Sequence, residues 1–135
     1  MTFNPLAAIN VTEVSLSLKN KNNGVIDMGS QTLNFGPELI DKLLKRELKF
    51  DEKTKEKLKD FKSRLLNNKR PSTSDFILNL GFKKYLSVDV NGAYDSLSYD
   101  LNEVIEEKYN YKKTYDLVIN NGTGEHVFNQ YSLFK

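Results

Sequence analysis

The side chains best suited to chemistry follow four short apolar runs of the chain, one set after each run. Carboxylates, amides and glycines dominate these sets, and hardly a cation stands among them. A phosphate site would favour Lys, Arg or a glycine-rich turn at a helix N-terminus, so the sets favour a different ligand. They comprise residues 27–31, Asp89 with Asn91 and Gly92, Asp100 with Asn102, and residues 120–124.

Acidic residues in these places could hold a cation that carries an adenosine. The Asp89 carboxylate can accept two hydrogen bonds from the vicinal hydroxyls of a ribose. Asp27 could accept one from a ligand ammonium, directly or through water, and Gly29 would let the backbone pass close to the ligand. The alternative is that strand-end Asp and Asn residues only cap turns and helices. That alternative is favoured for any one residue, whereas the four sets together favour a ligand.

Composition excludes several other chemistries. The chain has no cysteine, which excludes a thiolate nucleophile, a disulfide framework and Cys-based metal sites. Its one histidine, His126, leaves no room for an all-His metal site, and we predict no metal. Neither of the phosphate-binding patterns G-x-x-x-x-G-K-[ST] and G-x-G-x-x-G occurs.

The elements that must position these residues alternate between strands and helices. Apolar runs predict strands at 25–28, 85–90, 97–101 and 115–120, of which 97–101 is the weakest. Helical patterns cover 5–19, most of 37–81, the residues after Asn102 and those from about Glu125. Ser72 with Asp75 has the S-x-x-D form of a helix cap. Strands separated by helices pair in parallel, so we predict an open, mostly parallel, Rossmann-like α/β sheet of about four strands, with ligands beyond the strands' carboxyl ends.

Residues 24–33, 80–92, 98–102 and 115–130 carry a resemblance to a known family. Over about residues 23–135 the chain resembles the first part of a class I S-adenosylmethionine-dependent methyltransferase, although Ser30, Gln31 and Thr32 stand where that family usually has further glycines. The resemblance implies S-adenosyl-L-methionine as the cofactor, with Asp89 at the ribose hydroxyls and Asp100 near the adenine amino group. The implied cofactor-binding residues are Asp27, Gly29, Ser30, Gln31, Asp89, Asn91, Asp100, Leu101, Asn121 and Gly122.

The resemblance further implies transfer of a methyl group to an acceptor that the sequence does not identify. Glu125 and His126 are the candidate bases for that step, and the alternative for His126 is a polar residue in the first turn of a helix. We interpret residues 1–135 as one methyltransferase-like domain with a helical insertion at 37–81. The family's sheet has seven strands, so we expect this domain to be incomplete, or its open sheet edge to be covered by a partner chain or by self-association.

Two other functions stay open. One is a truncated module that binds the cofactor or another protein without turnover. The other is polyanion binding through residues 41–70, which hold 12 basic and 6 acidic side chains in a chain of net charge +2. The solvated face of a helix is the favoured explanation of this charge, and nucleic acid is the less favoured partner. The apolar runs are far shorter than the ~20 residues of a membrane helix, and the first residues lack the features of a secretory signal, so we expect a cytoplasmic protein with no membrane partner.

Overall fold

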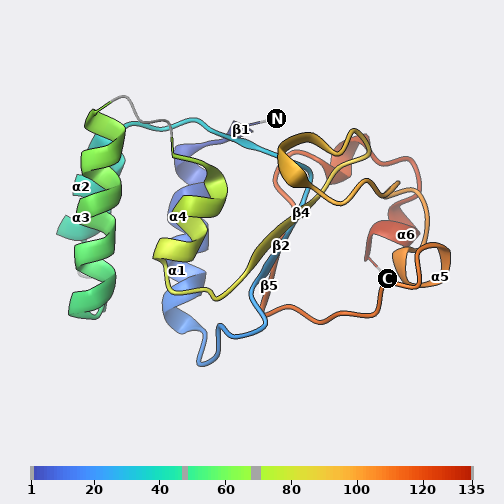
Figure 1. Ribbon diagram of the computed structural model, residues 1–135, viewed down its shortest axis with the longest axis horizontal. Helices are drawn as coiled ribbons and strands as arrows, with labels where there is room; N and C mark the ends of the chain where they lie inside the picture. Colours follow the sequence, from blue (N-terminus) through green and yellow to red (C-terminus); the bar gives the residue numbers. More distant parts are fainter. Residues whose placement is uncertain (1, 47–48, 68–70, 135) are drawn as a thin grey trace.

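A three-stranded parallel sheet lies at the centre of the protein, whose computed structural model describes residues 2–46, 49–67 and 71–134 (Figure 1). Its strands are β2 (Val25–Met28), β4 (Tyr85–Val88) and β5 (Leu117–Ile119), in the order β4–β2–β5. In the central strand β2, Val25, Ile26 and Asp27 are all buried, as expected for a parallel strand that is covered on both faces. A second parallel sheet joins the short strands β1 (Thr2–Phe3) and β3 (Thr32–Leu33).

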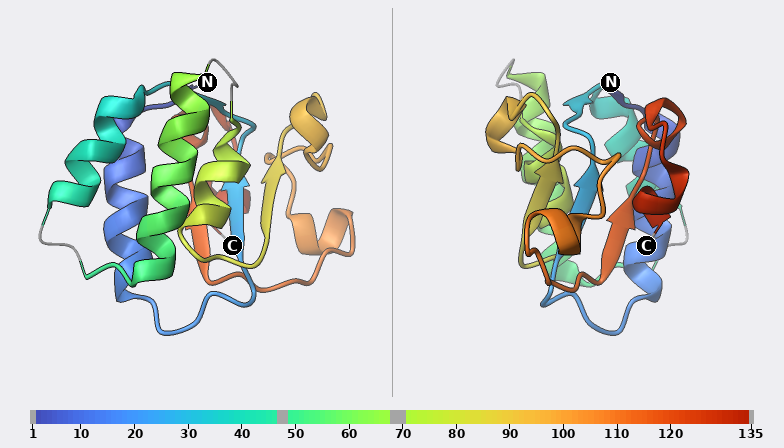
Figure 2. Two further views of the ribbon diagram at one scale, coloured as in Figure 1. Left: turned by 60° about the vertical axis from the view of Figure 1, so that its left-hand side comes forward. Right: turned by 90° about the vertical axis from the view of Figure 1, so that its right-hand side faces the viewer.

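Helices lie on both sides of the central sheet (Figures 1 and 2). One side carries α1 (Pro5–Ser17), α2 (Pro37–Lys45), α3 (Glu52–Leu66) and α4 (Thr73–Asn79). The other side carries the short helices α5 (Ile105–Lys108) and α6 (Gln130–Phe134). Two 3-10 turns, η1 (Ala93–Asp95) and η2 (Gly124–His126), follow β4 and β5 respectively. The molecule is therefore an α/β protein with parallel strands.

Alternating side chains of β2 enter two different cores. Val25 belongs to the large core, which lies between the sheet and helices α1 to α4 and includes Phe3, Ile40, Leu43, Leu58, Phe61, Phe76 and Ile77. Ile26 belongs to the small core on the opposite face, with Val88, Leu101 and Val127. Because side chains alternate along a strand, Asp27 points to the same face as Val25. A carboxyl group is thus placed at the edge of the large core.

The predicted strand at 97–101 does not form as a strand in the described part of the chain, so the sheet has three strands where about four are predicted. A single parallel bridge joins Leu97 to Val88. The Leu97 N–H donates to the Ser87 carbonyl at 2.8 Å, and the Asp89 N–H donates to the Leu97 carbonyl at 2.9 Å. Three residues after Leu97, the Asp100 side chain accepts from the backbone N–H of Asn102 and forms a local turn. This turn competes with a continuing ladder and ends the pairing.

Candidate functional site

Asp27 at the end of β2 is fully buried, and two side chains satisfy its carboxyl group. The Tyr85 hydroxyl donates to Asp27 Oδ2 at 2.9 Å, and Gln31 Nε2 donates to Asp27 Oδ1 at 2.8 Å. The strand register explains the first contact, because Val25 lies opposite Tyr85 and Asp27 opposite Ser87, so Tyr85 is a diagonal neighbour of Asp27 on one face. A buried carboxyl without such donors would be strongly destabilising.

Burial also changes the acidity of this pair. Loss of solvent raises the pKa of Asp27 to about 7, and the two hydrogen bonds from Tyr85 and Gln31 oppose that rise. Burial raises the pKa of Tyr85 as well, and the adjacent Asp27 carboxyl raises it further. Both groups disfavour their charged forms because the charge would lie away from water. The Asp27 carboxyl therefore holds its proton to a higher pH than an exposed aspartate does.

Gln31 connects this pair to the end of β5. Its amide oxygen accepts from Asn121 Nδ2 at 3.2 Å, and its backbone carbonyl accepts from the Thr73 hydroxyl at 3.0 Å. One chain of hydrogen bonds thus runs from the residues after β5, through the loop after β2, to the buried carboxyl and to β4. The ends of three strands are held together at one edge of the sheet.

Asp89 ties the loop after β2 to the end of β4. Its carboxylate accepts from the Ser30 N–H at 3.2 Å and from the Asn91 N–H at 3.0 Å, one on each oxygen. The Gly29 N–H donates to the Val88 carbonyl at 2.7 Å, and Gly29 has a φ of 109°, which a residue with a side chain rarely adopts. Each Asp89 oxygen keeps a second lone pair, so this half-buried carboxylate can accept further hydrogen bonds.

The other predicted residues have contacts of their own. The Asp100 carboxylate accepts from the backbone N–H and the side-chain amide of Asn102, and these bonds hold its pKa below the usual range. The Leu101 side chain is buried in the small core. Gly122 has a φ of 79° in the turn after β5.

The candidate bases Glu125 and His126 lie on η2, and their side chains are 70% and 71% exposed. Glu125 Oε1 and His126 Nε2 are 3.5 Å apart.

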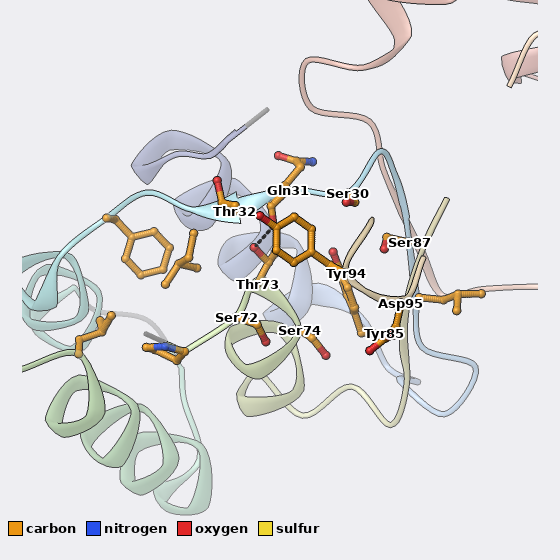
Figure 3. Close-up of a pocket in the computed structure, with 15 residues that line it drawn as sticks. Ser30, Gln31, Thr32, Ser72, Thr73, Ser74, Tyr85, Ser87, Tyr94 and Asp95 are labelled. Carbon is orange, nitrogen blue, oxygen red and sulfur yellow. Dashed lines mark hydrogen bonds between the residues drawn. The ribbon is translucent and has the colours of Figure 1, made fainter. Parts of the chain in front are cut away.

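A cavity of about 1020 Å³ opens beside the Asp27 pair on the α4 side of the sheet (Figure 3). Gln31 and Tyr85, the two partners of Asp27, form part of its wall. Of the ten predicted cofactor residues, two are among the described residues that line it, Ser30 and Gln31. Other lining residues are Phe35, Ser72, Thr73, Ser74, Ser87, Tyr94 and Asp95.

Neither Tyr85 nor the hydroxyl-bearing wall of this cavity was predicted from the sequence to belong to a site. Tyr85 meets Asp27 only through the register of β4 against β2, which a single sequence does not reveal. One feature of the sequence could have indicated the cavity. Ser87 is a polar residue inside a predicted strand, and the structure buries it. The cavity residues come from the loop after β2, from α4, from β4 and from η1, so their proximity depends on the tertiary fold.

Among the described residues, no group of three His, Cys, Asp or Glu side chains is placed to hold a metal ion. Within the same part of the chain, no helix has the length and apolar character needed to cross a membrane. Comparisons with protein-family models, with curated proteins and with solved structures find no match to this chain.

Proposed function

We propose that the protein is a Rossmann-like domain of the S-adenosylmethionine-dependent methyltransferase type, with the cofactor bound at the carboxyl edge of the central sheet. The observation that carries the proposal is the hydrogen-bonded convergence of three strand ends. Asp89 accepts from Ser30, and Asn121 donates to Gln31, so the loops after β2, β4 and β5 meet at one edge. Ligands of open α/β sheets bind at such an edge.

The strand order supports the same proposal. From β2 the chain passes to β4 on one side and later to β5 on the other, with Leu97 bridged to the outer side of β4. The order of strands reverses at β2, and the switch point lies between β2 and β5, next to Asp27 and Asn121. Such switch points are where doubly wound sheets bind nucleotides.

Each residue has a distinct role in this proposal. Asp89 accepts from the ribose hydroxyls through its remaining lone pairs. Asp27 acts as a positioning residue, because its buried carboxyl holds Gln31 and, through it, the residues after β5. The cofactor's positive sulfonium would be favoured at an edge where Asp89 and Asp100 supply negative charge. His126 or Glu125 would take a proton from the acceptor only if the acceptor reaches η2.

Calorimetry with S-adenosylhomocysteine, the product form of the cofactor, tests the proposal. We expect binding by the unmodified protein and at least tenfold weaker binding by Asp89→Ala, about the loss of one good charge-assisted hydrogen bond. The matched control is Asp60→Ala on the exposed face of α3, which should leave the affinity unchanged. Absence of binding at millimolar ligand would reject the proposal, and equal affinity of Asp89→Ala would reject the ribose role.

The second candidate is a module that binds the cofactor without turnover. The observation that favours it is the exposure of both candidate bases to solvent, since the Glu125 and His126 side chains on η2 are 70% and 71% exposed. Formation of S-adenosylhomocysteine from S-adenosylmethionine with hydroxylated acceptors separates the two candidates. Turnover that His126→Gln and Glu125→Gln reduce supports the enzyme, and binding without turnover supports the module.

Polyanion binding draws less support from the structure. Cations of α3 form ion pairs with neighbouring carboxylates, including Lys62 with Asp41 at 2.7 Å and Lys55 with Glu52 at 2.8 Å. Such pairs are typical of a solvated helix face. A steep fall of DNA affinity with rising salt concentration would nevertheless favour this function.

A further inference from the structure

We propose that the cavity between α4, β4 and η1 binds an uncharged ring that carries hydroxyl groups, of the class of the neutral sugars. This proposal concerns the wall of the cavity and does not depend on the cofactor proposed above. Its volume, about 1020 Å³, lies at the upper end of the ~300–1,000 Å³ typical of small-molecule sites. The space therefore accommodates a ring with its substituents.

Hydroxyl and amide groups from several elements line the cavity. Ser72, Thr73 and Ser74 stand at the start of α4, Ser87 comes from β4 and Gln31 comes from the loop after β2 (Figure 3). These groups can both donate and accept hydrogen bonds. Ser72, Thr73 and Gln31 already bond to protein groups but keep further lone pairs or an amide hydrogen. A ligand with several hydroxyl groups can use these and the hydroxyl groups of Ser74 and Ser87 in many combinations.

The charge of the wall selects against anions. Asp95 is the one charged side chain among the described lining residues, and its carboxylate can accept from two adjacent hydroxyl groups of one ring. Lys, Arg and His are absent from the lining that the structure describes. A phosphorylated or carboxylated ligand would therefore meet Asp95 without a compensating cation. The wall favours a neutral ligand.

Tyr94 supplies an aromatic surface at the mouth of the cavity. Its side chain is directed from η1 toward Gln31 and Thr73 (Figure 3), and the residue is 73% exposed. Tyr94 and Asp95 have φ values of 55° and 58°, a left-handed conformation that a residue with a side chain seldom adopts. Local strain of this kind clusters at ligand sites. Here it places an exposed ring and a carboxylate side by side.

The test is an NMR titration in which D-glucose, D-galactose or D-mannose is added to isotope-labelled protein. The amide chemical shifts are recorded at each sugar concentration. We expect shifts concentrated at the residues of α4, β4 and η1 that line the cavity. The decisive variant is Tyr94→Gly, because glycine relieves the left-handed strain while it removes the ring. Affinity should fall about tenfold, the effect of losing a large contact area, while the melting temperature stays equal or rises. Tyr94→Phe should keep the affinity, and Tyr131→Ala on α6 is the matched control.

Several outcomes would overturn the proposal. They are an absence of shifts with every neutral sugar, stronger binding of glucose 6-phosphate than of glucose, and full affinity in Tyr94→Gly. Shifts of the same amides by adenosine alone would assign the cavity to the nucleoside and also overturn it. Asp100→Ala should bind the sugar normally, because Asp100 is not among the described lining residues and its side chain bonds only Asn102. Tyr94→Gly thus tests sugar binding, whereas Asp89→Ala tests cofactor binding, so the failure of one proposal is distinguished from the failure of the other.

Discussion

At the scale of single residues, Asp27 makes the stability of the protein depend on pH. Its pKa is about 7 in the folded protein, against ~3.9 for an aspartate in an unfolded chain. Between about pH 4 and 7 the folded state therefore holds a proton that the unfolded state has released, and stability falls as pH rises through that range. Asp27→Asn, which resembles the protonated carboxyl, should become more stable relative to the unmodified protein by at most ~1.4 kcal/mol per pH unit.

Urea unfolding at several pH values between 4 and 7 measures this difference. Tyr85→Phe is the companion variant, because removal of the hydroxyl donor should raise the pKa of Asp27 further. A carboxyl titration followed by NMR would report that shift directly. An unfolding difference that is the same at pH 4 and pH 7 would contradict the buried, proton-holding state of Asp27.

Contacts between residues close together in the sequence could be predicted. Contacts that depend on how two strands pair could not. The sequence analysis placed Asp89 and Asn91 together after a strand, and a hydrogen bond of 3.0 Å joins them. Whether either residue binds a cofactor stays a prediction. Tyr85 could not be matched to Asp27, because a shift of one residue in the pairing would move it to the other face. The left-handed φ of Tyr94 has no sequence signal, since tyrosine seldom adopts it.

At the scale of elements, α4 begins with a complete capping box. The Ser72 hydroxyl accepts from the Asp75 N–H at 3.1 Å, and the Asp75 carboxylate accepts from the Ser72 N–H at 2.8 Å. Ser72→Ala should lower the free energy of unfolding by about 1 kcal/mol. Ser63→Ala on the exposed face of α3 is the control, with a change below about 0.5 kcal/mol. Equal losses in the two variants, measured by urea unfolding, would contradict a stabilising cap at Ser72.

Helix starts and the buried strand were the elements that the sequence predicts best. The prediction for β2 matches the observed residues, and the cap at Ser72 and the stop near Gly81 are confirmed. A helical pattern was predicted directly after Asn102, but α5 begins after Val104, and the Asn102 side chain bonds Asp100 and Asn129. The pairing of β1 with β3 joins residues 30 positions apart over two-residue strands, too short for any periodicity.

At the scale of the whole molecule, the two faces of the sheet are covered unequally. Helices α1 to α4 bury the large core, whereas the face that carries α5 and α6 buries fewer side chains. Leu6 on α1 and Leu66 on α3 are exposed on the first side. On and after β5, Val118 is 55% exposed, Phe128 is 97% exposed after η2, and Phe134 is 74% exposed on α6. Large exposed apolar side chains near an open strand are typical of association surfaces.

Self-association through β5 is the consequence that we propose for this surface. Within the described residues, β5 ends the strand order and pairs only with β2, where Val118 lies opposite Ile26. A second copy that pairs there would bury Val118 and satisfy the free edge. We expect sedimentation velocity to detect association that increases with protein concentration. Val118→Lys should reduce this association, because a lysine at a strand edge opposes pairing.

Val14→Lys, at a 40% exposed position of α1, is the matched control and should associate like the unmodified protein. A protein that stays monomeric at every concentration would contradict self-association. An equal effect of the two lysine substitutions would contradict association through β5.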